Sequence, residues 1–456
     1  MERRKPKAVF MAFGTKGDVY PLAAIATAFA CDQNQYDVML ITHSAHESLS
    51  IHLAQKHVQF WPVSSLPVLS ADQTDSEGRM EPCRKLLCPL HCGCSLCCSI
   101  QKAPADIDHS IIDLLCSAPS TFERQFQLEL PLLYRYLIDA PSGKVCWKDV
   151  IHWMWPLFTE NWGSWRNDVL HLSPCPFTVN SMFNHLIKFS VLTAYWPPKV
   201  LVCGFWFLPI EWQFTCKKCR DISLHDSSGH QYAKDDLCAS HLELQNFIKA
   251  APIFIGLSSI GSMGFLKDPY AFICILQTVL STTNYRFILF TAGYEPLESI
   301  VRRISTEASF ELKNCRDDCV PLCNGRLLCF FGSVPYRWLF PKCAAVIHHG
   351  GSGTTAAALR AGTPQVVCPF MLDQFYWAER MHWLGVSPEP LSRNHLLPDK
   401  NDDTSIHEAA RLLSMAIHDA LSPTVKARAA EVAQRILLED GVAEAIKHMK
   451  EELGLN

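Results

Sequence analysis

A glycine-rich segment near residue 350 has the clearest chemical potential in this sequence. It reads AVIHHGGSGTTAAALRAG over residues 345–362, so a short apolar run leads into glycines and then into a helix-like stretch. Glycine lets a backbone approach a ligand closely, and the first turn of a helix offers unpaired N–H groups and the positive end of a dipole. This pattern favours a phosphate site, to which the hydroxyls of Ser352 and Thr354 could add donors.

The segment differs from the common phosphate-binding fingerprints. No Gly-Lys-Ser/Thr follows the glycines, and their spacing is not GxGxxG. A purely structural strand-to-helix turn is therefore the alternative. Asp373 and Gln374 follow the next expected strand. Because open α/β sheets bind ligands at the carboxyl ends of their strands, this acid and amide are expected beside the glycines, where they suit the hydroxyls of a sugar.

Two close pairs of metal-binding residue types lie near the middle of the chain. They form Cys216-Lys-Lys-Cys219 and Cys238-Ala-Ser-His241, a C-x2-C-x18-C-x2-H spacing. Structural zinc sites use such pairs because two of them can clamp one ion tetrahedrally. The spacing predicts a structural zinc site, with free side chains as the alternative. A further, less regular group of metal candidates comprises Cys83, Cys88, Cys92, Cys94, Cys97 and Cys98.

The composition limits the class of protein. The chain has 456 residues, 41 basic and 45 acidic, and is 48% hydrophobic. This length suits two or three domains, the apolar content excludes a disordered chain, and the balanced charge argues against a nucleic-acid partner. No uncharged apolar run reaches roughly 18 residues, and the start MERRKPKAVF lacks the apolar stretch of a signal peptide. With 21 cysteines, these features predict a cytoplasmic protein with reduced thiols.

Strand-like and helix-like segments alternate at both ends of the chain, which is typical of parallel α/β sheets. Near the N-terminus we expect strands over 8–13, 36–42 and 58–62, and helices from Pro21 and over 44–56. In the second half we expect strands over 253–258, 286–290, 327–331, 344–347 and 365–368, with helices over 270–280, 354–361 and much of 405–453. The fold class is therefore α/β, with two Rossmann-like units.

Four segments of the chain carry longer motifs: HHGGSGTTAAALRAGTPQVVCPFMLDQFYWAERMHWLGV, AFGTKGDVYPLAAIATAFA, PIFIGLSSIGS and VPYRWLFPKCAAV. Together they resemble the GT-B glycosyltransferases, and specifically the plant-type sterol 3-beta-glucosyltransferases. The first is similar to the nucleotide-sugar motif of that family. AFGTKGDVYPLAAIATAFA resembles its GTRGDVQPF loop, PIFIGLSSIGS its IYIGFGS strand, and VPYRWLFPKCAAV its CPHDWLFxxCAAV segment. The resemblance implies a GT-B fold, in which two Rossmann-like domains face a cleft.

The resemblance also assigns donor-side roles. It implies that UDP-glucose is the donor substrate and that Asp373 and Gln374 bind the glucose hydroxyls. Trp338 would stack on the uracil, with a core aromatic as the alternative. His348 has no assigned role and could equally be a core residue. The pyrophosphate and the nucleotide would be held by His349, Gly351, Ser352, Gly353, Thr354, Ser258 and Ser259.

On the acceptor side, the resemblance points to the loop Gly14-Thr15-Lys16-Gly17-Asp18. Asp18 would polarise or deprotonate the acceptor hydroxyl as it attacks the anomeric carbon, with Thr15 nearby. The alternative is that Asp18 caps the helix expected from Pro21. His43 is a second candidate base, although a core or capping histidine is the alternative. The expected chemistry is a single inverting displacement that requires no metal cofactor, because a helix terminus and a histidine can balance the leaving-group charge.

The expected partners are UDP-glucose and a sterol or other lipid alcohol. A tryptophan-rich segment over 147–165 could line an apolar acceptor pocket or touch a membrane surface, and core packing is the alternative. The acceptor segments of the family are not recognisable between residues 65 and 120, where the cysteine group stands. The N-terminal domain is therefore expected to be either divergent or incomplete.

These observations divide the chain into four parts. We expect an acceptor-binding domain over 1–205 with a cysteine-rich insert at 81–100, and a linker with the zinc candidate over 206–250. A nucleotide-sugar-binding domain would follow over 251–425, and a helix within 426–456 would pack back on the first domain. The function expected is glucosyl transfer to the 3-hydroxyl of a sterol. The alternatives are the same reaction on another acceptor, or a noncatalytic protein that binds the nucleotide sugar.

Overall fold

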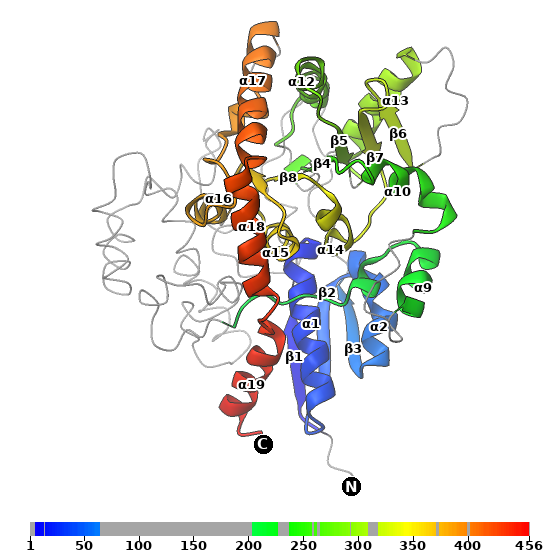
Figure 1. Cartoon of the computed structure of the whole chain (residues 1–456). Helices are drawn as coiled ribbons and strands as arrows, with labels where there is room; N and C mark the ends of the chain where they lie inside the picture. The colour runs from blue at the N-terminus through cyan, green and yellow to red at the C-terminus, as the bar shows by residue number, and fades with distance from the viewer. Residues whose placement is uncertain are drawn as a thin grey trace, which may run out of the picture.

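The computed structural model describes two α/β units joined by a connecting segment (Figure 1). The described residues are 5–12, 14–63, 203–226, 237–257, 260–261, 265–291, 293–308, 318–370, 374–398 and 402–455. The cysteine-rich group at 83–98 and the tryptophan-rich segment at 147–165 lie outside these residues, as does most of the expected acceptor domain.

The N-terminal unit contains a parallel sheet with the strand order β1-β2-β3. Its elements are β1 (Lys7–Met11), α1 (Lys16–Asp32), β2 (Asp37–His43), η1 (Ser44–Leu49), α2 (Ser50–Gln55) and β3 (Val58–Val63). Each strand follows the expected segment within about two residues, a shift that is ordinary for element ends. Helix α1 packs on the sheet through the fully buried side chains of Val19, Ala23 and Phe29.

Helix α1 begins five residues before Pro21, where the sequence placed its start. The reason is a capping box: the Thr15 hydroxyl accepts a hydrogen bond from the first turn, and Asp18 at the third helical position accepts the Thr15 N–H. Pro21 therefore lies inside the helix rather than at its first position. Asp18 is part of the cap but is not the N-cap residue, so that detail of the sequence-based alternative is wrong.

A connecting segment leads from the N-terminal unit to the C-terminal unit. Its elements are η6 (Ile210–Gln213), α9 (Lys217–Asp226), η7 (Ala239–His241) and α10 (Leu242–Ile248). Trp206 and Trp212 are buried with the N-terminal core, whereas Phe214 is buried with the core of the C-terminal unit. The segment is therefore packed against both units.

The C-terminal unit is built on a six-stranded sheet with the order β6-β7-β5-β4-β8-β9, parallel except for β6. Its strands are β4 (Ile253–Gly256), β5 (Phe287–Phe290), β6 (Cys319–Leu322), β7 (Leu327–Phe330), β8 (Ala345–His348) and β9 (Gln365–Val367). Its helices include α12 (Pro269–Thr282), α13 (Glu295–Ala308), α14 (Tyr336–Leu339), α15 (Ser352–Ala361) and α16 (Gln374–Trp383), with short turns η8 (Phe340–Lys342) and η9 (Arg393–His395).

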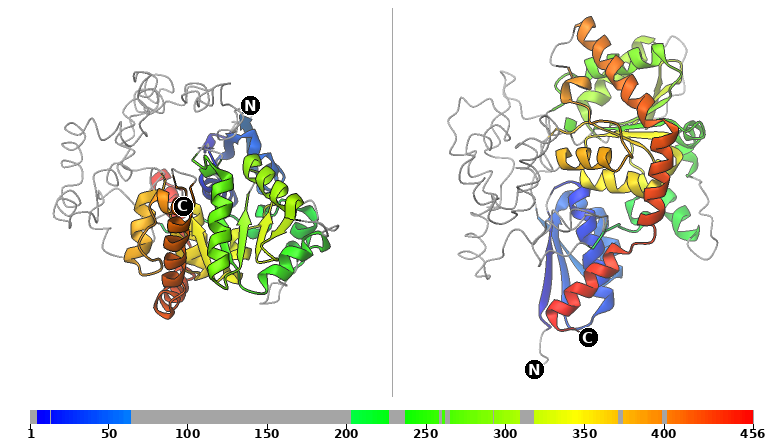
Figure 2. Two further views of the ribbon diagram at one scale, coloured as in Figure 1. Left: turned by 90° about the horizontal axis from the view of Figure 1, so that it is seen from above. Right: turned by 60° about the vertical axis from the view of Figure 1, so that its left-hand side comes forward.

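Both faces of this sheet are covered. Ile253 and Ile255 of β4 pack into a cluster with α12 and with α17 (Asp403–Ala420), whereas Phe254 between them packs into a cluster with α10 and α14. Strands that are buried on both sides read as continuous apolar runs, which explains why the sequence predicted β4, β5, β7 and β8 so well. Figure 2 shows the helices on either side of the sheet from above.

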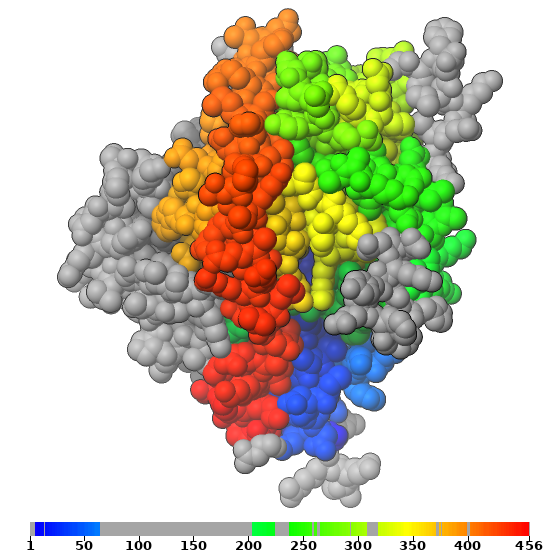
Figure 3. Space-filling view, in the orientation of Figure 1, coloured from blue at the N-terminus to red at the C-terminus, as the bar shows by residue number. Residues whose placement is uncertain are grey.

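The last helix returns to the N-terminal unit. Helices α17, α18 (Pro423–Ile436) and α19 (Gly441–Leu453) form a band that runs across both units, and α19 lies beside α1 (Figures 1–3). Ala445 and Ile446 are buried with α1, and Lys450 forms a 2.8 Å ion pair with Asp32. The segment that packs back is therefore α19, while the domain limit expected at residue 425 falls within α18.

The α/β fold class expected from the sequence is confirmed, with a Rossmann-like parallel sheet in each unit as in the GT-B arrangement. Among the described residues, no helix combines the length and the apolar character needed to cross a membrane.

Candidate functional site

The site lies where the strand order of the C-terminal sheet reverses. From β4, the chain proceeds to β5 and β7 on one side of the sheet and to β8 and β9 on the other. Strands β4 and β8 are neighbours, and their last residues, Gly256 and His348, are paired. Open α/β sheets bind ligands at the carboxyl ends of the strands that flank such a switch point. The glycine-rich loop follows β8 at this position.

His348 holds the start of the glycine-rich loop and is completely buried. The N–H of Gly350 donates to Nδ1 of His348 over 3.0 Å, so this nitrogen carries no proton. Nε2 of His348 must then be the protonated nitrogen, and it donates to Oε1 of Gln365 over 2.8 Å. Burial lowers the pKa of His348 to about 3. His348 is therefore a neutral core histidine that positions the loop.

Gly350 lets this loop lie against the next one. Its φ is +88°, and a Cβ atom on Gly350 would lie only 2.9 Å from the carbonyl oxygen of Gln374. The side chain of Gln374 is buried, and its Oε1 accepts the N–H of Phe370 over 2.9 Å, which closes the loop that carries it. The loops after β8 and β9 are thus in direct contact at this edge, as the sequence predicted for adjacent strand ends.

Helix α15 presents its N-terminus at the same edge. Its N-cap is Gly351, and no side chain of the described residues caps it. The first-turn N–H groups of Ser352, Gly353 and Thr354 precede the first intrahelical bond, from Thr355 to Gly351. These residues are half-buried, so a ligand could reach them. The positive end of the helix dipole and three donors make this terminus chemically suited to a phosphate group.

His349 stands between this helix terminus and β4. Burial lowers its pKa to about 4, and the opposing effect of a hydrogen bond with the Gly256 backbone is smaller. A Cβ on Gly351 would lie 2.6 Å from Nε2 of His349, so only glycine leaves room for the ring. His349 is thus neutral at pH 7, and it would act on a phosphate as a hydrogen-bonding group rather than as a charge.

In the N-terminal unit, Asp18 and Thr15 form one hydrogen-bonded group. Oδ2 of Asp18 accepts from the N–H of Thr15 over 2.7 Å and from its hydroxyl over 2.8 Å. The Asp18 side chain is exposed to solvent, yet protein surrounds it on its other sides. The resulting desolvation raises the pKa of Asp18, and these hydrogen bonds only partly offset it. A carboxylate with a raised pKa that water can reach is suited to accept a proton.

His46 is the residue of this region that the sequence analysis missed. Its Nε2 lies 3.0 Å from the carbonyl oxygen of Gly14, to which it must donate because a carbonyl only accepts. His46 is buried, and this burial lowers its pKa. His43, the candidate base, is half-buried, its pKa is lowered by desolvation, and its ring lies 6.4 Å from that of His46. The two histidines at the end of β2 and in the turn after it were the available signal.

The two glycine-containing loops meet, although more than 300 residues separate them in sequence. A Cβ on Gly353 would lie 3.2 Å from Cα of Gly17, so the N-termini of α15 and α1 touch through glycines. Nearby, Nζ of Lys16 donates to the Ser333 hydroxyl over 3.2 Å, which links the units again. The loop with the candidate base therefore lies beside the candidate phosphate site.

Trp338 lies in the core of the C-terminal unit. It is 8% exposed, and Nζ of Lys342 lies 4.5 Å from the centroid of its ring. Lys342 lies over one face of this ring, and uracil stacking on Trp338 stays a prediction. The other predicted donor residues, Ser258, Ser259 and Asp373, lie outside the described residues.

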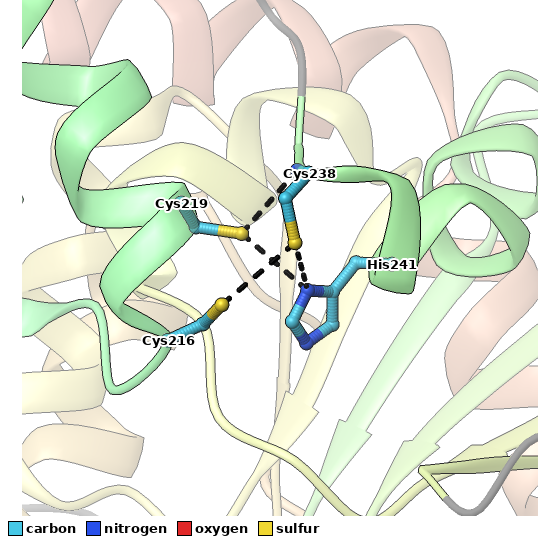
Figure 4. Close-up of side chains that lie close together, drawn as sticks. All are labelled: Cys216, Cys219, Cys238 and His241. Atoms are coloured by element: carbon cyan, nitrogen blue, oxygen red, sulfur yellow. Dashed lines mark hydrogen bonds between the residues drawn. The ribbon is translucent and has the colours of Figure 1, made fainter.

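The four predicted metal ligands come together. Figure 4 shows Cys216, Cys219, Cys238 and His241 pointing toward a common centre, and their ligand atoms all lie within 4.8 Å of one another. This cluster belongs to the connecting segment rather than to the edge of the sheet described above.

Comparison with known proteins finds a family match near the end of the chain. Residues 318–450 match the model of the erythromycin biosynthesis protein CIII-like C-terminal domain. The matched region includes β8, the glycine-rich loop and α15, so it contains the candidate phosphate site.

Curated relatives confirm the resemblance to sterol glucosyltransferases. The chain is 44% identical over 207 residues to sterol 3-beta-glucosyltransferase UGT80A2 of Arabidopsis thaliana, covering 45% of this chain and 26% of that protein. It is 38% identical over 485 residues to the sterol 3-beta-glucosyltransferase of Vanderwaltozyma polyspora, covering 97% and 34%. The chain thus spans about a third or less of the length of these relatives.

Among solved structures, the calicheamicin glycosyltransferase CalG4 aligns with a TM-score of 0.48 and 14% identity, covering 99% of each chain.

Proposed function

We propose that this protein is an inverting glycosyltransferase that moves glucose from UDP-glucose to the 3-hydroxyl of a sterol or a similar hydrophobic alcohol. The observation that carries the proposal is the contact between the two loops, 3.2 Å from a Cβ on Gly353 to Cα of Gly17. It brings a carboxylate with a raised pKa next to a helix N-terminus suited to a diphosphate. The names of the relatives support glucose as the transferred sugar and a sterol as the acceptor, whereas UDP rests on the sequence resemblance.

In this proposal the donor diphosphate is held by uncharged groups. The first-turn amides of α15 and the hydroxyls of Ser352 and Thr354 donate hydrogen bonds, and the neutral His349 adds another. As the bond between glucose and phosphate breaks, negative charge grows on the leaving UDP. Oriented donors in a partly buried place stabilise that charge, so the proposed reaction requires no metal cofactor.

On the other side of the anomeric carbon, Asp18 accepts the proton of the acceptor hydroxyl. The N–H and hydroxyl of Thr15 hold the Asp18 carboxylate through Oδ2, and His46 fixes the preceding carbonyl of Gly14. A raised pKa makes the ionised carboxylate a stronger base than an ordinary aspartate. Attack opposite the leaving group inverts the configuration of the sugar.

One observation favours a noncatalytic alternative. The hydrogen bond from the Thr15 N–H to Oδ2 of Asp18 belongs to the capping box of α1, so this residue also has a purely structural role. A protein that binds a nucleotide sugar without transferring it would retain the same geometry. In either case a cytoplasmic location, with peripheral membrane contact for a sterol acceptor, is part of the proposal.

The test uses radiolabelled UDP-glucose, a panel of sterols and lipid alcohols, and the full chain. The proposal expects a labelled glucoside with inverted configuration, and loss of product in Asp18→Asn with donor binding retained. Donor binding without transfer to any acceptor would support the noncatalytic alternative. No binding of UDP-glucose would overturn both.

A further inference from the structure

We propose that Cys216, Cys219, Cys238 and His241 bind one structural zinc ion that fixes the connecting segment between the two units. The site does not take part in sugar transfer, and the proposal holds whether or not the protein is a transferase. The four side chains come from two short stretches on either side of residues 227–236, which lie outside the described residues.

Three of the distances between the ligand atoms are close to those of a tetrahedral zinc site. Zinc binds sulfur at about 2.3 Å and nitrogen at about 2.0–2.1 Å, which sets the edges of a tetrahedron at about 3.8 Å between sulfurs and about 3.5 Å between sulfur and nitrogen. Here Sγ of Cys216 and Sγ of Cys238 are 3.7 Å apart. Nδ1 of His241 lies 3.4 Å from Sγ of Cys219 and 3.2 Å from Sγ of Cys238.

The surroundings suit thiolate ligands and an oriented histidine. The N–H of Cys238 points to Sγ of Cys219 over 3.4 Å, and such a donor stabilises a negatively charged sulfur. While Nδ1 of His241 faces the sulfurs, its Nε2 lies 3.6 Å from a carboxylate oxygen of Asp318. A carboxylate behind a ligating histidine is the arrangement that orients such ligands in zinc proteins. Asp318 is a positioning residue that the spacing of the cysteines did not reveal.

Two other roles for these cysteines, a disulfide and simple apolar packing, fit the cluster less well. The sulfurs of Cys216 and Cys238 are too far apart for a disulfide, and the cysteines of the cluster are all free. Buried cysteines often serve as small apolar residues. That role does not account for an imidazole nitrogen directed at two sulfurs while its other nitrogen faces a carboxylate.

The position of the cluster indicates its purpose. Cys216 and Cys219 stand at the start of α9, just after Trp212, which stacks on His52 of the N-terminal unit at 5.0 Å between ring centroids. Cys238 and His241 lead into α10, whose Leu244 and Phe247 are buried against the C-terminal sheet. A zinc ion would therefore fasten the segment packed on the first unit to the helix packed on the second.

The first experiment measures the zinc content of the purified full chain by elemental mass spectrometry. About one tightly held zinc per chain is expected, and X-ray absorption should show three sulfurs and one nitrogen around it. Cobalt substitution should give the spectrum of a tetrahedral thiolate site. Absence of bound zinc, together with unchanged folding when a chelator is present, would overturn the proposal.

Variants separate this site from the other cysteines. His241→Ala and Cys219→Ala should lose the zinc and lower the melting temperature by at least about 4 °C, whereas Cys274→Ser, a control outside the cluster, should keep the zinc. His241→Cys supplies a fourth thiolate and should retain the metal, which distinguishes lost ligation from misfolding. Asp318→Asn should weaken zinc affinity about 10–100-fold. Zinc retained in both alanine variants would refute the assignment.

Discussion

Gly350 provides the sharpest test of the loop geometry at the candidate donor site. In Gly350→Ala, the new Cβ meets two difficulties: a φ of +88° and a backbone oxygen, that of Gln374, at 2.9 Å. The left-handed conformation costs about 1–2 kcal/mol for a residue with a Cβ. Relieving the close contact requires the two loops to separate, and overpacking of this kind costs about 1–3 kcal/mol. We expect a total loss of about 2–5 kcal/mol in the free energy of unfolding.

The matched control is Gly325→Ala in the turn between β6 and β7. Gly325 has a φ of +74°, but a Cβ there would have nothing within 4 Å. Gly325→Ala should therefore lower the free energy of unfolding only through the left-handed conformation, by about 1–2 kcal/mol. The difference between the two variants therefore isolates the contact between the loops.

The assays are urea unfolding and titration with UDP-glucose. Because the displaced loop carries the first turn of α15, Gly350→Ala should raise the Kd for the donor at least about tenfold, equivalent to about 1.4 kcal/mol of binding free energy. Gly325→Ala should leave it unchanged. Equal stability losses in the two variants, with equal donor affinity, would refute the contact between the loops after β8 and β9.

Three further predictions concern the groups beside this loop. Asp18→Asn should reduce the rate of transfer at least about 100-fold, while donor affinity stays within twofold of wild type. In the wild type, kcat/KM should fall as pH drops through the raised pKa of Asp18, because the base must be ionised. A pH profile that is identical in Asp18→Glu and wild type would contradict this role. Because the pKa of His348 is about 3 in the folded protein, the unfolded chain binds a proton at this residue at a higher pH than the folded chain does. The free energy of unfolding should therefore decrease as pH falls from about 6.5 toward 3. The decrease is at most about 1.4 kcal/mol per pH unit. Urea unfolding at several pH values measures this. The free energy of unfolding should change less per pH unit in His348→Gln than in the wild type. Thr15→Ala should cost about 1 kcal/mol through the lost cap of α1, and Thr15→Ser should restore most of it.

Local pattern was enough to predict much of this fold. Strands β4 and β8 were placed within about two residues because each is a short apolar run that is buried on both faces. The zinc candidate was found for a similar reason, since its spacing is a local signal. Strand β6 escaped notice: it has four residues, includes Pro321, and pairs antiparallel at the edge of the sheet.

Contacts between distant segments could not be predicted in this way. The role of His46 depends on the carbonyl of Gly14, which lies on another strand end. The tautomer of His348 depends on its hydrogen bond with Gln365, and Nε2 of His241 lies 3.6 Å from a carboxylate oxygen of Asp318. In each case the residue was visible in the sequence, but its partner is set by the tertiary fold.

The return of α19 to the first unit has a consequence for how the chain folds during synthesis. Ala445 and Ile446 cover the same core as Val19 and Phe29 of α1, so that core is finished by residues made more than 400 positions later. Domains generally fold as units as they leave the ribosome, N-terminal first. Until α19 emerges, the part of this core that Ala445 and Ile446 cover remains without that cover. We therefore expect a chaperone to help the nascent N-terminal unit before α19 is made.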